Sequence, residues 1–181
     1  MGDLSGFRWA LPVAVAFGLG ACTSAGMSVG KSAGVSAAGV SFARAGSCSM
    51  FPAFKPGDRL QFDSDVGEPQ RGDIVSYRAN VPGAPREMVH RVVGLPGERL
   101  EPAPDGGVLV NGAPLVEGYL PAGLTTYMRE PVEVPADHWF MLGDNRERSS
   151  DSRVTGPIPR ADILTKLTNV EPVKSDDEDP C

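Results

Sequence analysis

The stretch DIVSYRANVPGAPREMVHRVVGLPG, residues 73–97, decides the fold class of this chain. It holds two strand candidates, Asp73–Arg78 and Met88–Val93, both rich in the β-branched and aromatic residues that favour sheets. The turn Gly94–Gly97 closes the second strand with two glycines and a proline. No segment shows the long 3.6-residue apolar repeat of an amphipathic helix. The pattern therefore predicts a mainly β domain.

Further along the chain, the same alternation of short apolar runs and turns continues. Val108–Val110 and Ala113–Leu115 flank Asn111-Gly112, which predicts a β-hairpin with a type I′ turn. His138–Leu142 is a further strand candidate. Residues 160–168 could form a short helix. We expect antiparallel sheets with little helix.

Composition limits the possible functions. The 181 residues fit one domain with tails, and 22 glycines and 17 prolines favour turns and short strands. The formal net charge is −6, and no basic patch is visible, so nucleic acid is not an expected partner. We expect residues 173–181 to form a disordered, solvated tail. Its acidic run comprises Asp176, Asp177, Glu178 and Asp179.

The cysteines and histidines do not follow a metal-binding pattern. Cys22, Cys48 and Cys181 form no CxxC pair, and His90 and His138 are far apart in sequence. We therefore expect no metal and no cofactor. A Cys48–Cys181 disulfide is conceivable in an exported protein, but the loose tail does not favour it. Cys48 is expected to pack or to face solvent.

The N-terminus is typical of an export segment. The apolar run 9–21 is too short for a membrane-spanning helix, which needs about 20 residues, and it suits the apolar region of a signal peptide. Leu19–Cys22 resembles a bacterial lipobox, in which the cysteine is lipidated. Residues 1–22 are thus interpreted as a lipoprotein signal peptide, with an uncleaved anchor or plain secretion as alternatives. Residues 23–45, rich in Ser, Gly and Ala, are interpreted as a flexible tether. Each alternative places the body on the extracytoplasmic side of the membrane.

Three motifs carry the functional signal. They read SMFP at 49–52, HRVVGLPGE at 90–98 and GDNRERSSDSR at 143–153. In this order they resemble bacterial type I signal peptidases (leader peptidases, peptidase S26). The resemblance covers about residues 46–172 and implies a β-rich signal-peptidase-like catalytic domain. It implies a serine endopeptidase that removes signal peptides from exported preproteins after small residues, without a cofactor.

The resemblance assigns the nucleophile and its surroundings. Ser49 matches the catalytic serine, which needs a base to take its proton and an oxyanion hole to stabilise the tetrahedral intermediate. The Ser49 backbone N–H and the Ser47 hydroxyl match the two oxyanion-hole donors. Met50 resembles a residue that shapes the substrate pockets.

His90 stands where the bacterial enzymes have a catalytic lysine. A histidine has an unperturbed pKa of about 6.5, so a neutral imidazole can accept the Ser49 proton at pH 7 and return it to the leaving amine. In this respect the chain resembles the endoplasmic-reticulum and archaeal branch of the family, which pairs serine with histidine.

A catalytic histidine needs a partner that fixes its tautomer. We expect Asp151 to orient His90, with Asp144 as the alternative. In the resembled bacterial enzymes the residue matching Ser149 bonds to the base, and the residue matching Asp151 pairs with that matching Arg153. A purely structural interpretation is that the two aspartates tie strands together through arginines. The supporting residues of the third motif are Asp144, Arg146, Ser149 and Arg153.

Two functions are compatible with these motifs. The first is a signal peptidase that uses Ser49 and His90 to cut an extended peptide laid beside a strand. The alternative is a catalytically degenerate, lipid-anchored homologue that binds exported peptides without cleaving them.

Overall fold

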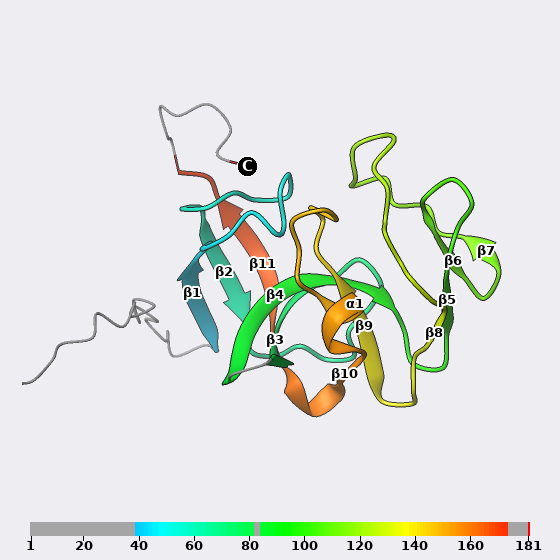
Figure 1. The fold of residues 1–181 in the computed structure, drawn as a ribbon. Coiled ribbons are helices and arrows are strands. Elements are labelled where there is room, and N and C mark those ends of the chain that lie inside the picture. The colour runs from blue at the N-terminus through cyan, green and yellow to red at the C-terminus, as the bar shows by residue number, and fades with distance from the viewer. Residues whose placement is uncertain (1–38, 82–83, 174–180) are drawn as a thin grey trace, which may run out of the picture. The chain divides into compact units, whose positions relative to one another are not determined.

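The computed structural model describes residues 39–81, 84–173 and 181 (Figure 1). They form two antiparallel sheets, which confirms the predicted mainly β, antiparallel class. The predictions for residues 1–22, including lipidation of Cys22, and for the acidic run lie outside the described residues. In the part of the chain that the structure describes, no helix is long and apolar enough to cross a membrane.

The larger sheet has seven strands in the order β1-β2-β11-β3-β4-β9-β10. Their bounds are β1 Val40–Arg44, β2 Arg59–Asp63, β3 Ile74–Val81, β4 Ala84–Gly94, β9 His138–Leu142, β10 Ile158–Pro159 and β11 Ile163–Glu171. Strand β1 begins inside the range that the sequence analysis gave to the tether, because it pairs along β2 from Val40↔Asp63 to Arg44↔Arg59.

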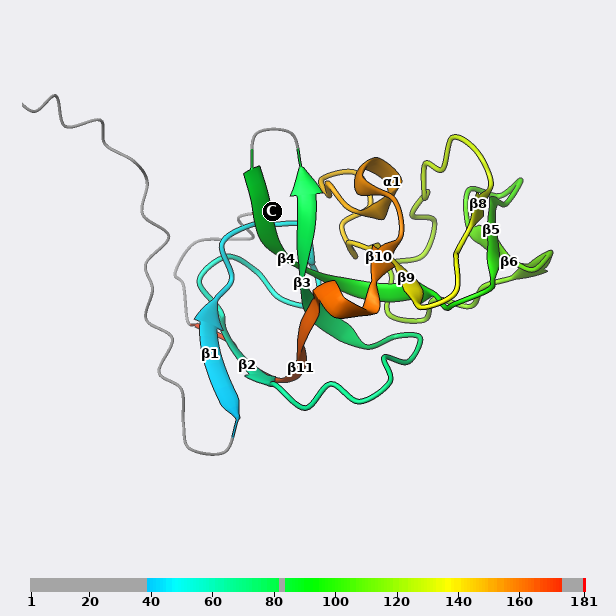
Figure 2. The ribbon, with the colours of Figure 1, turned by 90° about the horizontal axis from the view of Figure 1, so that it is seen from below.

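The smaller sheet has four strands in the order β7-β6-β5-β8 and lies beyond the β9 side of the larger sheet (Figures 1 and 2). Their bounds are β5 Arg99–Pro102, β6 Val108–Val110, β7 Ala113–Pro114 and β8 Val132–Glu133. The predicted hairpin is confirmed: Asn111 and Gly112 have φ angles of 52° and 80°, as a type I′ turn requires.

The predicted helix at 160–168 is wrong. Only Arg160–Asp162 are helical, as the 3₁₀ turn η1, and the chain continues as β11 between β2 and β3. Pairing on both sides satisfies the backbone of this segment, and tertiary context of this kind overrides weak local propensity. One short helix, α1 at Ser152–Thr155, was not predicted.

Strand β4 is the structural centre of the site. It pairs with β3 along its length, from Ile74↔Arg91 to Val81↔Ala84. On its other side it pairs with β9 only from Arg91 to Gly94. Among the described residues, the stretch Ala84–His90 therefore has no strand partner on that side. Figure 2 shows the bent course of β3 and β4.

Three apolar clusters hold the sheets together. One lies around β3, β4 and β9 and contains Tyr77, Val92 and Trp139; a second lies between β9 and the smaller sheet. The third packs Met50 and Phe54 against β2. Burial of each large apolar side chain contributes about 1.5–3 kcal/mol, so both sides of the site rest on well-packed core.

Candidate active site

His90 and Tyr77 face each other inside the larger sheet. The β3–β4 register pairs Val75 with His90 and Tyr77 with Met88, so Tyr77 and His90 are diagonal neighbours on one face. The Tyr77 hydroxyl lies 2.8 Å from His90 Nδ1. Tyr77 and His90 are 0% and 2% exposed, respectively. The strand register thus fixes one side of the imidazole.

Ser149 lies at the other side of the imidazole. Its hydroxyl is 3.2 Å from His90 Nε2. It belongs to the loop between β9 and α1, which includes the third motif. Both ring nitrogens of His90 therefore have hydroxyl partners in a buried site.

Burial keeps both members of the Tyr77–His90 pair neutral. Desolvation lowers the pKa of His90 to about 4, with a lesser raising effect from Asp151 and a lowering effect from Arg153. Desolvation, with Asp151 nearby, raises the pKa of Tyr77 well above its usual value. At pH 7 the site therefore holds an uncharged imidazole and an uncharged phenol.

The structure places Asp151 differently from the expected orienting role. Its carboxylate accepts hydrogen bonds from the Arg153 side chain and from Gly143 N–H, and Tyr77 is the residue at His90 Nδ1. Burial opposes ionisation of Asp151, but the hydrogen bonds from Arg153 and Gly143, with the charge of Arg153, hold its pKa below its usual value. Asp151 thus acts on His90 through its charge.

Three buried arginine–carboxylate pairs organise the third motif. Asp144, the alternative orienting residue, binds Arg91 through both carboxylate oxygens and does not reach His90. Multiple hydrogen bonds in such pairs fix geometry as well as charge. The pairs are Arg91–Asp144, Arg146–Glu117 and Arg153–Asp151.

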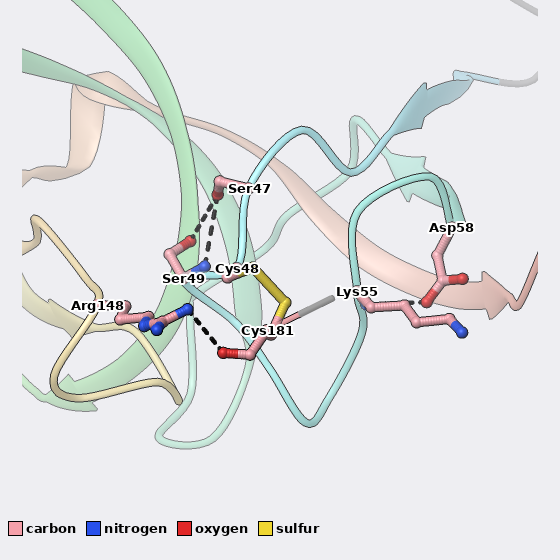
Figure 3. Close-up of a disulfide and its surroundings, with 7 residues drawn as sticks. All are labelled: Ser47, Cys48, Ser49, Lys55, Asp58, Arg148 and Cys181. Atoms are coloured by element: carbon pink, nitrogen blue, oxygen red, sulfur yellow. Dashed lines mark hydrogen bonds between the residues drawn. A yellow bond between two sulfur atoms is a disulfide. The ribbon is translucent and has the colours of Figure 1, made fainter. Parts of the chain in front are cut away.

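The Ser47–Ser49 turn carries the nucleophile candidate. The Ser47 and Ser49 hydroxyls are 3.1 Å apart, and the Ser49 N–H points to Ser47 Oγ at 3.5 Å (Figure 3). Both serines are at least partly accessible, whereas Met50 is fully buried in the cluster beneath the turn. A peptide carbonyl could therefore meet two donors and a nucleophile at this turn.

Gly143 brings the Ser49 turn and Ser149 together. A β-carbon at Gly143 would lie 2.5 Å from both the Ser49 carbonyl oxygen and Ser149 Cβ. The Ser49 carbonyl also accepts a hydrogen bond from Asn145 N–H at 3.0 Å. Within the described residues, Ser49 Oγ bonds to Ser47 and not to His90. Ser149 is the side chain that neighbours both the Ser49 backbone and His90.

A disulfide joins Cys48 to Cys181, with 5.5 Å between their Cα atoms (Figure 3). The expectation that Cys48 only packs or faces solvent is therefore wrong. Beyond β11, Val173 N–H donates to the Asp58 side chain, and the Asp58 carbonyl accepts from Ala45 N–H, two residues before Ser47. The main-chain oxygen of Cys181 also accepts a hydrogen bond from Arg148 at 2.7 Å. Cys181 thus links the turn of Ser49 to the loop of Ser149.

Sequence reasoning missed Tyr77 and did not favour the disulfide of Cys181. Tyr77 gave no motif signal, and only the strand register shows that it faces His90. The Cys181 pairing was considered, but nothing in the sequence shows that Cys181 lies beside Cys48. An open cleft of about 1080 Å³ adjoins Ser149 and lies between residues 127–132 and the third motif.

The site has relatives among known proteins. The family described as "Signal peptidase, peptidase S26" matches residues 23–170. Signal peptidase I of Leptolyngbya laminosa is 37% identical over 125 residues, which cover 64% of this chain and 61% of that protein. Signal peptidase I of Bacillus amyloliquefaciens is 34% identical over 117 residues, covering 58% of this chain and 59% of that protein.

A solved signal peptidase I from Enterococcus faecalis V583 aligns with a TM-score of 0.48 and 30% identity. It covers 56% of this chain and 98% of the solved chain. The present chain spans about three fifths of the curated relatives named above.

Proposed function

We propose, from the premise that this chain belongs to the signal peptidase family, peptidase S26, that it is a serine endopeptidase that cleaves signal peptides from exported preproteins. One observation carries the proposal. The turn that holds Ser47 and Ser49 lies against Ser149, a loop serine. The Ser149 hydroxyl is hydrogen-bonded to the buried, neutral His90. Family membership supplies the reaction, and this geometry supplies the groups to perform it.

Ser49 is the nucleophile in this proposal. When a scissile carbonyl enters, its oxygen takes the Ser47 hydroxyl and the Ser49 N–H as donors. This frees Ser49 Oγ from its 3.1 Å contact with Ser47. Ser49 Oγ then forms a bond to the carbonyl carbon, and the carbon–nitrogen bond breaks as the amine leaves.

His90 is the base. The proton of Ser49 passes to Nε2, with Ser149 positioned between the two residues, and is delivered to the leaving amine. Water then attacks the acyl ester, and the same groups return its proton to Ser49. A pKa of about 4 keeps His90 able to accept a proton at neutral pH, although it makes the imidazole a weaker base than usual.

The substrate is an extended peptide that pairs with the free edge of β4 next to His90, by β-strand addition. We propose small residues before the cleaved bond, as the family resemblance implies. Met50 supports this region from beneath and does not itself line the surface. The open cleft beside Ser149 gives the chain beyond the bond a path away from the site.

The domain is proposed to act on the extracytoplasmic side of a membrane, attached through the lipidated Cys22. The Cys48–Cys181 disulfide supports this location, since disulfides persist in oxidising compartments. In this arrangement residues 23–38 link the anchor to a catalytic body that includes β1, Val40–Arg44. Mass spectrometry of the membrane-extracted protein tests the anchor: an acylated Cys22 at the mature N-terminus supports it, and an intact residue 1–22 segment contradicts it.

Incubation of the full-length protein with a preprotein carrying an Ala-x-Ala site tests the catalytic proposal. Cleavage after the second alanine, abolished in Ser49→Ala and His90→Ala, is the expected result. Cleavage that persists in Ser49→Ala would come from a contaminant. No cleavage, beside a family enzyme that cuts the same preprotein, would leave the peptide-binding alternative.

A further inference from the structure

The hydroxyls at His90 make the direction of each hydrogen bond decidable. The Tyr77 phenol is 0% exposed, and its single proton needs an acceptor because an unmade hydrogen bond is costly in a buried site. Among the described residues, the partner of this hydroxyl is His90 Nδ1, at 2.8 Å. The Tyr77 hydroxyl therefore donates and Nδ1 accepts.

The other ring nitrogen follows from neutrality. Because His90 is uncharged at pH 7, an unprotonated Nδ1 leaves the ring proton on Nε2. The ring then donates from Nε2 to the Ser149 hydroxyl, 3.2 Å away. One ordered chain of hydrogen bonds thus runs from Tyr77 through His90 to Ser149.

We propose that Tyr77 is a positioning residue that selects the tautomer of His90: its hydroxyl donates to Nδ1 and holds the free protein in the Nε2–H form. A carboxylate at this place, as in a Ser-His-Asp triad, would select the opposite tautomer. A hydroxyl can accept as well as donate, but the buried Tyr77 proton needs Nδ1 as its acceptor, and this fixes the direction in the free protein. Phenylalanine would keep the packing and lose the selection.

This assignment has a consequence for catalysis, which rests on the proposed function. In the Nε2–H form, His90 cannot take the Ser49 proton at Nε2. The ring must first exchange to the Nδ1–H form, in which the Tyr77 oxygen becomes the acceptor. The free enzyme is therefore in a resting state, and Tyr77 supports the ring in both states.

The second histidine of the chain provides an internal standard. The chain has two histidines, and His138 Nδ1 lies 2.8 Å from the carbonyl oxygen of Ala136. A carbonyl can only accept, so Nδ1 of His138 carries the proton. The two histidines should therefore show opposite tautomers in one spectrum.

Long-range ¹H–¹⁵N correlation spectra of the full-length protein test the proposal directly. They would be recorded at about pH 8, above the unperturbed histidine pKa of about 6.5. We expect Nε2 of His90 to show the shift of a protonated ring nitrogen and Nδ1 that of an unprotonated one, with the reverse for His138. A His138→Gln variant assigns the two rings.

Tyr77→Phe is the decisive variant, with Tyr127→Phe as its control because Tyr127 is 66% exposed. In Tyr77→Phe the two His90 nitrogen shifts should move towards each other as both tautomers become populated, while Tyr127→Phe leaves them in place. A protonated Nδ1 in the wild type would overturn the proposal. Unchanged His90 shifts in Tyr77→Phe would overturn it as well.

Kinetics separate this inference from the proposed function. Tyr77→Phe should lower kcat about tenfold, because the Nδ1–H of the ring that has taken the Ser49 proton loses the Tyr77 oxygen as its acceptor in a buried site. KM should stay within about twofold, since no contact with the substrate is lost. The spectra need no substrate. If the wild type shows the expected tautomers but cuts no preprotein, the proposed function fails and the tautomer assignment stands. If the wild type cuts the preprotein but its spectra show a protonated Nδ1, the proposed function stands and the tautomer assignment fails.

Discussion

The two halves of the candidate site are built in different ways. His90 lies in the middle of a sheet, where it is 2% exposed and neighbouring strands fix its position. Ser49 lies in an accessible turn that is held from outside, by the Asn145 N–H and by the disulfide next to it. His90, the proton acceptor, is therefore shielded from water and fixed in position, whereas Ser49, the nucleophile, remains accessible to a peptide.

This difference shows what each half needs. A base whose pKa is lowered by burial requires exclusion of water, which the packed strands and the loop of Ser149 provide here. A nucleophile that meets an extended substrate cannot be buried, so its geometry depends on contacts made across the chain. Substitutions in the turn should therefore change the cleavage rate more than the stability. Loss of the Cys48–Cys181 disulfide should change the stability more than the cleavage rate.

Loss of the Ser47 hydroxyl should have the largest effect. Ser47→Ala removes one proposed oxyanion donor from the open half of the site, and a single such donor contributes on the order of 10²–10³ in kcat. The measurement is kcat for preprotein cleavage, with the melting temperature as a check on folding. Ser47→Thr, which keeps a hydroxyl, should recover part of the rate. Equal rates in Ser47→Ala and the wild type would remove Ser47 from the mechanism.

Gly143→Ala should have the next largest effect. The new β-carbon would meet the Ser49 carbonyl oxygen and the Ser149 side chain, and would push the two halves apart. A displacement of about 1 Å costs on the order of 10²-fold in rate. Gly118→Ala is the matched control, because nothing lies within 4 Å of its β-carbon. If both variants cleave at the wild-type rate, the close approach of Ser49 and Ser149 has no catalytic role.

Breaking the disulfide should have a smaller effect on cleavage. Cys181→Ser should lower the free energy of unfolding by about 3 kcal/mol, since a cross-link over a long loop restricts the unfolded chain. The cleavage rate should fall less than about fivefold, because Asn145 still holds the Ser49 carbonyl. Denaturant titration of Cys181→Ser and of the reduced wild type should give the same loss. No loss in either would show that the bond does not form in solution.

Much of the fold could be predicted because the residue patterns that indicate its turns and strands are local in the sequence. The Asn111-Gly112 turn and the strand His138–Leu142 follow from residue type and alternation, and the structure has both. The segment 160–168 was mistaken for a helix because its strand state depends on partners on both sides, β2 and β3.

Only those residues of the candidate site that belong to a recognisable sequence motif could be predicted. The motifs pointed to Ser47, Ser49, His90 and Ser149, which the structure gathers in one region. They could not indicate Tyr77, because its contact with His90 arises from strand register. For the same reason, the pairing of Asp144 with Arg91 needed the structure, since the two lie on adjoining segments 53 residues apart.

The pH dependence of cleavage tests most directly whether buried, neutral His90 is the base for Ser49. The kcat/KM of the wild type should stay high at neutral pH and fall only as pH drops through about 4, because protonation of His90 removes the acceptor. His90→Lys needs a neutral amine, whose unperturbed pKa is about 10.4, so any activity it has should rise on the alkaline side. An acidic limb at the same pH in both proteins would contradict the account, because the titrating group would then not be His90.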